Sequence, residues 1–241
     1  MDERVKKIID KSKSIAFFGG AGVSTESGIP DFRSEAGLYS AQSEYGFSPE
    51  QMLSHSFFMG NMKTFFDYYK KNLVYKDAQP NKAHYALAKF EEEGKLSGIV
   101  TQNIDGLHQK AGNRKVFELH GSILRNYCMD CGEFHDLDYI MDDQNCPAGI
   151  PRCRKCGGVV KPDVVLYEEA LDDNVIRGAV KAITDADTLI VGGTSLVVYP
   201  AAGLVQYFRG DNIILINKSQ TAYDNNADLV IYDSIGKVLG D

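Results

Sequence analysis

The chain has 241 residues, of which 44% are hydrophobic and 24% are charged, and its formal net charge is −7. This length and composition predict a globular protein with at most two domains. The negative charge gives no general attraction to nucleic acid or to anionic membranes, so we expect neither as a direct partner. No apolar run approaches the roughly 18 residues that span a bilayer, and the amino terminus lacks a secretory signal, which favours a cytoplasmic location.

The first buried strand is expected at residues 15–18, after a short amphipathic helix over residues 2–11. It leads into residues 19–33, which read GGAGVSTESGIPDFR. Glycines at a strand end let backbone amides approach a phosphate, and a helix that begins near Ser24 or Thr25 would direct its positive end to the same place. Because Thr25 stands where the motif G-x-G-x-x-G has its third glycine, a generic glycine-rich turn stays an alternative.

Residues 30–33 present an acid, an aromatic ring and a guanidinium, which suit a polar ligand with a flat ring and an anionic part. A long loop is expected over residues 34–48. Helices then follow over residues 49–75, with an interruption at Gly60. We expect their many aromatic side chains to form a core, and a substrate groove is the alternative.

Two further strands end in polar side chains. A helix that Asn81 caps and Gly94 ends leads into a buried strand at residues 98–102, and another strand is expected at residues 116–119. Ligands bind at the carboxyl ends of parallel strands, so four polar residues there are candidate site residues: Gln102, Asn103, Asp105 and His108. His120 follows the second strand and is a candidate general base, although a lone histidine is more often structural.

Four of the five cysteines form two C-x-x-C pairs, which are Cys128 with Cys131 and Cys153 with Cys156. Two such pairs can supply the four thiolates of a tetrahedral zinc site, which would stabilise this module without taking part in chemistry. A redox disulfide within each pair is the alternative. We expect the acidic segment between the pairs to be a solvated excursion. Cys146 belongs to neither pair, so we expect a free, exposed thiol, with assistance to the metal as the alternative.

The last third of the chain is expected to complete the sheet. Residues 161–168 begin as an extended edge segment, whose proline leaves backbone groups free to pair with a peptide strand. A helix over residues 172–186 leads to a buried strand within residues 187–195 that ends in glycines and hydroxyls. A further helix and two strands are expected at residues 200–208, 213–217 and 228–232. Several parallel strand ends would then converge, which indicates an α/β fold with a doubly wound parallel sheet.

Six motifs occur in one order over nearly the whole chain: GAGVSTESGIPDFR, TQNIDGLH, ELHG, the two cysteine pairs, GTSLVVYPAA, and the dipeptide IN at residues 216–217. In this set and order the chain resembles the sirtuins, which are NAD-dependent protein deacylases. The resemblance implies a single catalytic core over residues 1–241 with a Rossmann-like large domain and a small domain. The large domain would comprise about residues 1–39, 79–121 and 161–241, and the small domain a helical insertion at 40–78 and a zinc module at 122–160. NAD would lie between the two.

The resemblance also implies roles for individual residues. At the phosphates and the adjoining ribose these would be Gly20, Ala21, Thr25, Arg33, Gly193, Thr194 and Ser195. Near the adenosine they would be Asn217 and Ile235, on the nicotinamide ribose Gln102, and in the nicotinamide pocket Phe32, Ile104 and Asp105. Lys218 would also bind the cofactor. The substrate peptide would lie as an added strand between two segments, formed by Val164, Val165, Leu166 and Tyr167 and by Val197, Val198 and Tyr199.

The activity that the resemblance implies is NAD-dependent removal of acetyl groups from lysines of peptides or proteins. Nicotinamide would leave the ribose as the acyl oxygen attacks, and Phe32 would shield the reacting centre from water. His120 would act as general base on a ribose hydroxyl, while Asn103 would position ribose and water. NAD would be consumed as a co-substrate, giving the deacetylated lysine, nicotinamide and O-acetyl-ADP-ribose, and one zinc ion would be structural.

Two departures from the family pattern concern the substrate. Tyr167-Glu168-Glu169 stands where the family has Phe-Gly-Glu, so Glu168 adds bulk and charge, and the two acids favour basic peptides. Residues 66–69, Phe-Asp-Tyr-Tyr, lack the tyrosine and arginine that family members use for acidic acyl groups. We therefore expect acetyl or other uncharged acyl groups rather than succinyl.

Three other functions stay open at this level. Mono-ADP-ribosyl transfer to a protein would use the same cleavage of NAD. A non-catalytic NAD-binding sensor or adaptor would dock a partner through its zinc module. An oxidoreductase would use NAD as a hydride carrier. The presence of both Asn103 and His120 favours the deacetylase.

Overall fold

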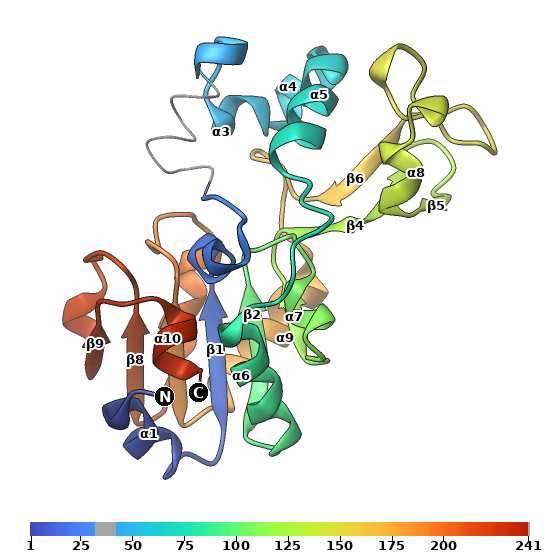
Figure 1. The fold of residues 1–241 in the computed structure, drawn as a ribbon. Coiled ribbons are helices and arrows are strands. Elements are labelled where there is room, and N and C mark those ends of the chain that lie inside the picture. Colours follow the sequence, from blue (N-terminus) through green and yellow to red (C-terminus); the bar gives the residue numbers. More distant parts are fainter. Residues whose placement is uncertain (32–41, 241) are drawn as a thin grey trace.

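The computed structural model describes residues 1–31 and 42–240 (Figure 1). Within these ranges the strands form a six-stranded sheet in the order β3-β2-β1-β7-β8-β9 and a three-stranded sheet in the order β5-β4-β6. The large sheet consists of β1 (Ile15–Gly19), β2 (Leu96–Thr101), β3 (Val116–Glu118), β7 (Thr188–Gly192), β8 (Asn212–Ile216) and β9 (Leu229–Ile231). The small sheet consists of β4 (Gly121–Cys128), β5 (Phe134–His135) and β6 (Val160–Val164).

The strand order of the large sheet confirms the doubly wound fold. β1 pairs in parallel with β2 on one side and with β7 on the other. The pairs β2 with β3, β7 with β8, and β8 with β9 are also parallel. Along the chain, β2 and β3 are added on one side of β1, and β7, β8 and β9 are then added on its other side. The strand order therefore reverses between β1 and β7. Sheets of this kind bind ligands beyond the carboxyl ends of the strands at such a switch point.

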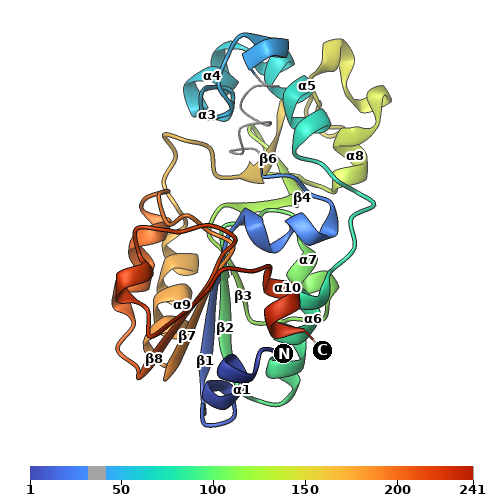
Figure 2. The ribbon, with the colours of Figure 1, turned by 60° about the vertical axis from the view of Figure 1, so that its left-hand side comes forward.

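Helices cover both faces of the large sheet, as Figures 1 and 2 show. Phe17 of β1 faces one hydrophobic core, and the next residue, Phe18, faces the other, because successive side chains of a strand point to opposite faces. Burial on both faces explains why β1 reads as a continuous apolar run. The first core includes α1 (Glu3–Ile9), α6 (Lys82–Glu92) and α10 (Ile235–Leu239), and the second includes α9 (Asp173–Thr184) and the 3-10 helix η5 (Ala201–Tyr207).

A third hydrophobic core joins the helical insertion to the small sheet. Phe58, Phe66 and Tyr69 are fully buried, and they share this core with Ile140 and Val160 of the zinc module. The aromatic side chains of the insertion therefore form a core, as expected. Its helices are α3 (Pro49–Met52), α4 (His55–Gly60) and α5 (Met62–Asn72), and the zinc module adds α8 (Leu137–Met141) with η3 (Asp143–Asn145) and η4 (Pro147–Gly149). Elsewhere the chain forms α7 (Leu107–Lys110), η1 (Ala21–Val23), η2 (Thr25–Ser27) and η6 (Asp224–Asn226).

The prediction of a helix that begins near Ser24 or Thr25 was wrong about the type of helix. The chain there forms two single turns of 3-10 helix, η1 and η2, and Gly28 ends the second turn with a φ of 83°. Glycine adopts this left-handed conformation readily, so the helix cannot grow past it. A three-residue turn aligns few peptide dipoles, and the case for a phosphate site therefore rests on the strand ends and their glycines.

The acidic segment between the cysteine pairs is also more ordered than expected. It contains α8, which Asp136 caps by accepting a hydrogen bond from the Tyr139 amide at 2.8 Å, and which buries Leu137 and Ile140. Cys146 is only 5% exposed, so the expected surface position was wrong. The acids lie around an apolar face that holds the segment against the rest of the small sheet. None of the described helices has the length and apolar character needed to cross a bilayer.

Candidate active site and metal centre

The loops that follow β1 and β7 pack directly against each other at the switch point. The Gly22 amide donates to the Gly193 carbonyl at 2.9 Å. A Cβ atom on Gly22 would lie 2.6 Å from the Gly193 Cα, and one on Gly20 would lie 2.9 Å from the Gly193 carbonyl oxygen. Gly193 itself has a φ of 61°, which favours glycine. The glycines are therefore required for the two loops to meet, and their meeting places Gly20, Ala21 and Thr194 side by side.

A chain of hydrogen bonds links the first of these loops to the end of β2. The Asn103 side-chain amide donates to Ser24 Oγ at 3.0 Å, and Ser24 Oγ donates to Asp105 Oδ2 at 2.6 Å. The Leu107 amide donates to the other carboxylate oxygen of Asp105 at 2.9 Å. Burial raises the pKa of Asp105, and the bonds from Ser24 and Leu107 oppose this shift. The orientations of Asn103 and Asp105 are thus fixed relative to Ala21.

Ser24 is a site residue that sequence reasoning missed. Its side chain is 1% exposed and lies between two predicted site residues, Asn103 and Asp105. The available signal was its place inside the glycine-rich motif, next to Thr25, where a hydroxyl would be buried by the adjoining loop. We interpret Ser24 as a positioning residue, because its described contacts are with other side chains of the site.

Gln102 connects the two halves of the site. Its side-chain amide donates to Thr194 Oγ1 at 3.1 Å, and its backbone carbonyl lies 3.0 Å from His120 Nδ1. A carbonyl oxygen can only accept a hydrogen bond, so Nδ1 of His120 carries the proton. Nε2 of the neutral ring is then the nitrogen that can take up a proton, which is the arrangement that a general base requires.

One cleft of about 210 Å³ is lined by Ala21, Ser24, Gln102, Asn103, Asp105 and His120, but not by Thr194. Its walls come from the loops at the edge of the large sheet, from α5 and the residues after it, and from residues 164–169. The cleft thus brings the predicted catalytic residues and the predicted peptide-binding residues together. The predicted residues that line it are Ala21, Gln102, Asn103, Ile104, Asp105, His120, Val164, Val165, Leu166, Tyr167, Val198 and Tyr199.

The segment after β6 is less open than expected. β6 is an edge strand, since it pairs with β4 alone within the described sheet. Beyond it, however, the amide of Val165 donates to the His120 carbonyl at 3.0 Å, and the amide of Tyr167 donates to the Leu53 carbonyl at 2.9 Å. The Leu166 amide donates to Glu169 Oε2 at 2.9 Å. The expectation of unpaired backbone groups is therefore wrong for these amides, because amides in a partly buried segment need partners.

The four paired cysteines meet at one point of the zinc module. Their sulfur atoms all lie within 4.8 Å of one another, and all four are free thiols. A tetrahedral zinc ion with Zn–S distances of about 2.3 Å places its sulfurs about 3.8 Å apart, so the cluster fits the metal. His135 Nε2 lies 3.4 Å from Cys153 Sγ and is placed to support that ligand. Cys146 lies outside the cluster, and its thiol donates to the Ile140 carbonyl at 3.2 Å.

Comparison with known proteins identifies the family. Residues 20–200 match the family model described as "Sir2 family". This chain belongs to the Sir2 family. A protein of Clostridium acetobutylicum named NAD-dependent protein deacetylase is 66% identical, over 98% of this chain and 95% of its own. A protein of Clostridium perfringens with the same name is 64% identical, over 100% of this chain and 98% of its own.

Solved Sir2 structures share the fold over almost the entire chain. One, described as Sir2 with p53 peptide and NAD⁺, has a TM-score of 0.85 and 31% identity, over 99% of this chain and 96% of its own. Another, with a deacetylated p53 peptide and 3′-O-acetyl ADP-ribose, has a TM-score of 0.89 and 32% identity, over 98% and 95%. The sirtuin resemblance inferred from the motifs is thereby confirmed.

Several residue assignments in this Sir2 chain stay predictions. Thr25 Oγ1 donates to the Gly22 carbonyl at 3.0 Å, within its own loop. Asn217 follows β8 and donates to the Ser219 carbonyl at 2.9 Å. Ile235 begins α10 and is 2% exposed, so its side chain belongs to the core under Gly192. Phe32 and Arg33 lie outside the described residues, whereas Ser195, Val197 and Lys218 are exposed.

Proposed function

We propose that this protein is an NAD-dependent protein lysine deacetylase that transfers the acetyl group from lysine to ADP-ribose. The observation that carries the proposal is the single cleft in which His120 and Asn103 meet the residues expected to bind a peptide, Val164 to Tyr167. The Clostridium relatives carry this activity in their names, and their similarity extends over nearly the whole chain. Nicotinamide and O-acetyl-ADP-ribose would be the other products.

In this proposal each polar residue has a role that its contacts suit. NAD is a co-substrate, and its phosphates would lie against the packed loops of Ala21 and Thr194. Nε2 of His120 would take the proton of a ribose hydroxyl, and the bond from Nδ1 to the Gln102 carbonyl would stabilise the charged ring that results. Asn103, which Ser24 holds in place, would position the ribose and the attacking water.

The metal would have a structural role. Cys128, Cys131, Cys153 and Cys156 complete a tetrahedral shell, which leaves no position for a substrate, so a zinc ion there would stabilise the fold. Free thiols in this number suit a reducing compartment, which supports the cytoplasmic location that we propose. The division into a large and a small domain is also proposed, and the separate core of the helical insertion and the zinc module supports it.

The lining of the cleft favours uncharged acyl groups. Tyr68 and Tyr69 are buried in the core of the helical insertion, and Asp67 accepts hydrogen bonds from Tyr45 at 2.8 Å and from Lys71 at 3.0 Å. Among the described residues that line the cleft there is no lysine or arginine to bind an acidic acyl group. We therefore propose acetyl-lysine or another lysine with an uncharged acyl group as the substrate.

The variant His120→Ala tests the catalytic assignment. We expect deacetylation of an acetyl-lysine peptide to fall by at least about 100-fold, as loss of a general base should cause. Zinc content and thermal stability should stay near those of the unchanged protein, since His120 is not a metal ligand. Near-normal turnover in this variant would remove His120 from the mechanism.

Mass spectrometry of the products separates the alternatives. Free O-acetyl-ADP-ribose indicates deacetylation, whereas ADP-ribose attached to a protein indicates mono-ADP-ribosyl transfer. Reduced cofactor, seen by its near-ultraviolet absorbance, would indicate an oxidoreductase. NAD binding without nicotinamide release on any acyl-lysine peptide would indicate a sensor or adaptor.

A further inference from the structure

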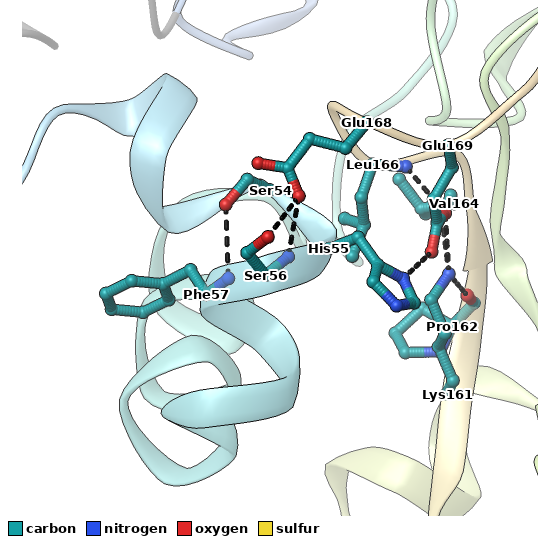
Figure 3. Close-up of polar contacts among 10 residues, drawn as sticks. All are labelled: Ser54, His55, Ser56, Phe57, Lys161, Pro162, Val164, Leu166, Glu168 and Glu169. Atoms are coloured by element: carbon teal, nitrogen blue, oxygen red, sulfur yellow. Dashed lines mark hydrogen bonds and ion pairs between the residues drawn. The ribbon is translucent and has the colours of Figure 1, made fainter.

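The segment after β6 is fastened to the helical insertion at the rim of the cleft (Figure 3). The Tyr167 amide donates to the Leu53 carbonyl at 2.9 Å, and the His55 amide donates to the Tyr167 carbonyl at 2.9 Å. These two bonds form a short parallel bridge. The next two residues, Glu168 and Glu169, both line the cleft and both reach the first turn of α4.

Glu169 is an acid whose charge the protein itself compensates. Its Oε1 accepts from His55 Nδ1 at 2.9 Å, and its Oε2 accepts from Lys161 Nζ at 3.1 Å and from the Leu166 amide at 2.9 Å. Burial raises the pKa of Glu169, but the Leu166 amide, His55 and Lys161 outweigh burial and hold the pKa below its usual value. Glu169 is therefore an ionised group with a cation already beside it.

Glu168 is held by neutral donors instead. Its Oε2 accepts from the Ser56 amide at 2.8 Å and from Ser56 Oγ at 2.6 Å. The bonds from Ser56, and to a smaller extent the charge of His55, lower the pKa of Glu168. Figure 3 shows the second carboxylate oxygen directed away from Ser56. Within the described ranges no lysine or arginine forms an ion pair with Glu168, and the residue is exposed.

The backbone conformation of Glu168 is unfavourable for a residue with a side chain. Its φ is 76°, in the left-handed region that glycine adopts readily and that strains other residues. A strained backbone at the rim of a cleft, with its side chain fixed by two hydrogen bonds from Ser56, points to a functional role.

We propose that Glu168 is a specificity-determining residue that selects acyl-lysine peptides with an arginine or lysine next to the acyl-lysine. This inference rests on the proposed function. The ionisable acids of the described cleft lining are Asp105, Glu168 and Glu169. Asp105 is tied to Ser24, and Glu169 is paired with Lys161, so Glu168 is the rim acid whose charge is available to a peptide. A peptide cation would be attracted there and a peptide acid repelled.

Three matched acetyl-lysine peptides test this proposal, with arginine, glutamine or glutamate beside the acetyl-lysine. For the unchanged protein we expect kcat/KM for the arginine peptide to exceed that for the glutamine peptide by about threefold to fivefold, the size of a solvent-exposed ion pair. The effect should lie mainly in KM and should shrink in about 0.5 M salt, which screens exposed charges. The glutamate peptide should be the poorest substrate.

Two variants should abolish the ratio between the arginine and glutamine peptides. In Glu168→Gln the amide oxygen can still accept from Ser56, and Glu168→Gly restores the residue that the left-handed backbone favours. The matched control is Glu92→Gln, which removes the same charge from an exposed side chain at the last residue of α6, near the opposite end of β2. This variant should leave the ratio unchanged.

Binding measurements keep the outcomes distinct. The Kd of each peptide in the presence of NAD should show the same ratio, whether or not turnover occurs. An unchanged ratio in both Glu168 variants overturns the inference while leaving the deacetylase proposal intact. Absence of nicotinamide release with every peptide would overturn the proposed function, and the Kd ratios would still decide the role of Glu168.

Discussion

At the scale of single residues, two buried histidines make the protein sensitive to acid. The rings of His84 and His108 lie 4.8 Å apart, and both side chains are at most 1% exposed. Burial lowers the pKa of His84 to about 4. Burial, together with the neighbouring His84, also holds the pKa of His108 well below its usual value. In the unfolded chain both rings take up protons below about pH 6.5.

The sign of the resulting pH dependence follows from these shifts. Because the folded pKa values are depressed, the contribution of the two rings to the free energy of unfolding is complete above about pH 6.5 and is lost as the pH falls toward 4. We expect stability to fall below pH 6.5 by up to about 1.4 kcal/mol per pH unit for each histidine. Thermal unfolding between pH 7.5 and pH 5 measures this slope.

The variant His84→Asn isolates one member of the pair. His84 Nδ1 accepts a hydrogen bond from the Asn81 amide at 3.1 Å, and the side-chain oxygen of asparagine can accept the same bond. The acid-dependent loss of stability should then be about half that of the unchanged protein. A slope identical to that of the unchanged protein would show that other groups cause the loss.

Sequence motifs predicted several of the residues that line the cleft, among them Asn103 and His120, but they did not predict the contacts that orient those residues. His120 and Asn103 were placed correctly at strand ends, because the parallel sheet brings those ends to one edge. The proton on His120 Nδ1 depends on the Gln102 carbonyl, and the position of Asn103 depends on Ser24. Both partners come from contacts between segments distant in the chain or from backbone atoms, which a residue pattern does not record.

At the scale of elements, the contact between the loops after β1 and β7 should be sensitive to a single methyl group. In Gly22→Ala the added Cβ would lie 2.6 Å from the Gly193 Cα, so the loops would have to separate. We expect a Tm lower by roughly 3–10 °C and weaker binding of NAD, as overpacking predicts for a chain of this size.

The matched control for this contact is Gly60→Ala. A Cβ on Gly60, at the end of α4, meets no atom within 4 Å, and the residue has no positive φ. This variant should keep the Tm and the NAD affinity of the unchanged protein. Equal stability of Gly22→Ala and Gly60→Ala in calorimetry would mean that the loops can separate without cost.

Helices and strands could be predicted where their buried residues follow a clear pattern in the sequence. The central strands β1 and β7 are buried on both faces, so they appeared in the sequence as continuous apolar runs. α8 was missed because its buried residues, Leu137, Tyr139 and Ile140, are too few to outweigh the acids around them. The helix expected near Thr25 was stopped by Gly28, whose left-handed conformation depends on the path of the loop.

Two paired strands, β4 and β6, run from the zinc module to the cleft and connect the two sites. β4 begins directly after His120, and β6 ends at Val164, the first residue of the proposed peptide-binding segment. The two strands pair with each other, from Gly121 opposite Val164 to Cys128 opposite Val160. The cysteine end of this ladder therefore supports the end that adjoins His120, the proposed general base.

Removal of the metal should loosen this ladder and leave the large sheet folded. Zinc binding contributes to folding of the module that holds it, whereas the large sheet has two hydrophobic cores of its own. After treatment with a strong chelator, we expect the amides of β4 and β6 to exchange hydrogen much faster, and deacetylation to be lost. The amides of β1 and β7 should stay protected, as mass spectrometry of the exchanged peptides would show.

The cysteines themselves provide the controls for this prediction. Cys128→Ser removes one ligand and should reduce bound zinc well below one ion per chain, with the same pattern of exchange as the chelated protein. Cys146→Ser changes a buried thiol outside the cluster and should keep the full zinc content. Unchanged protection of β4 and β6 after complete loss of zinc would mean that the shared core of the helical insertion and the zinc module holds the ladder by itself. The metal would then have no part in positioning His120.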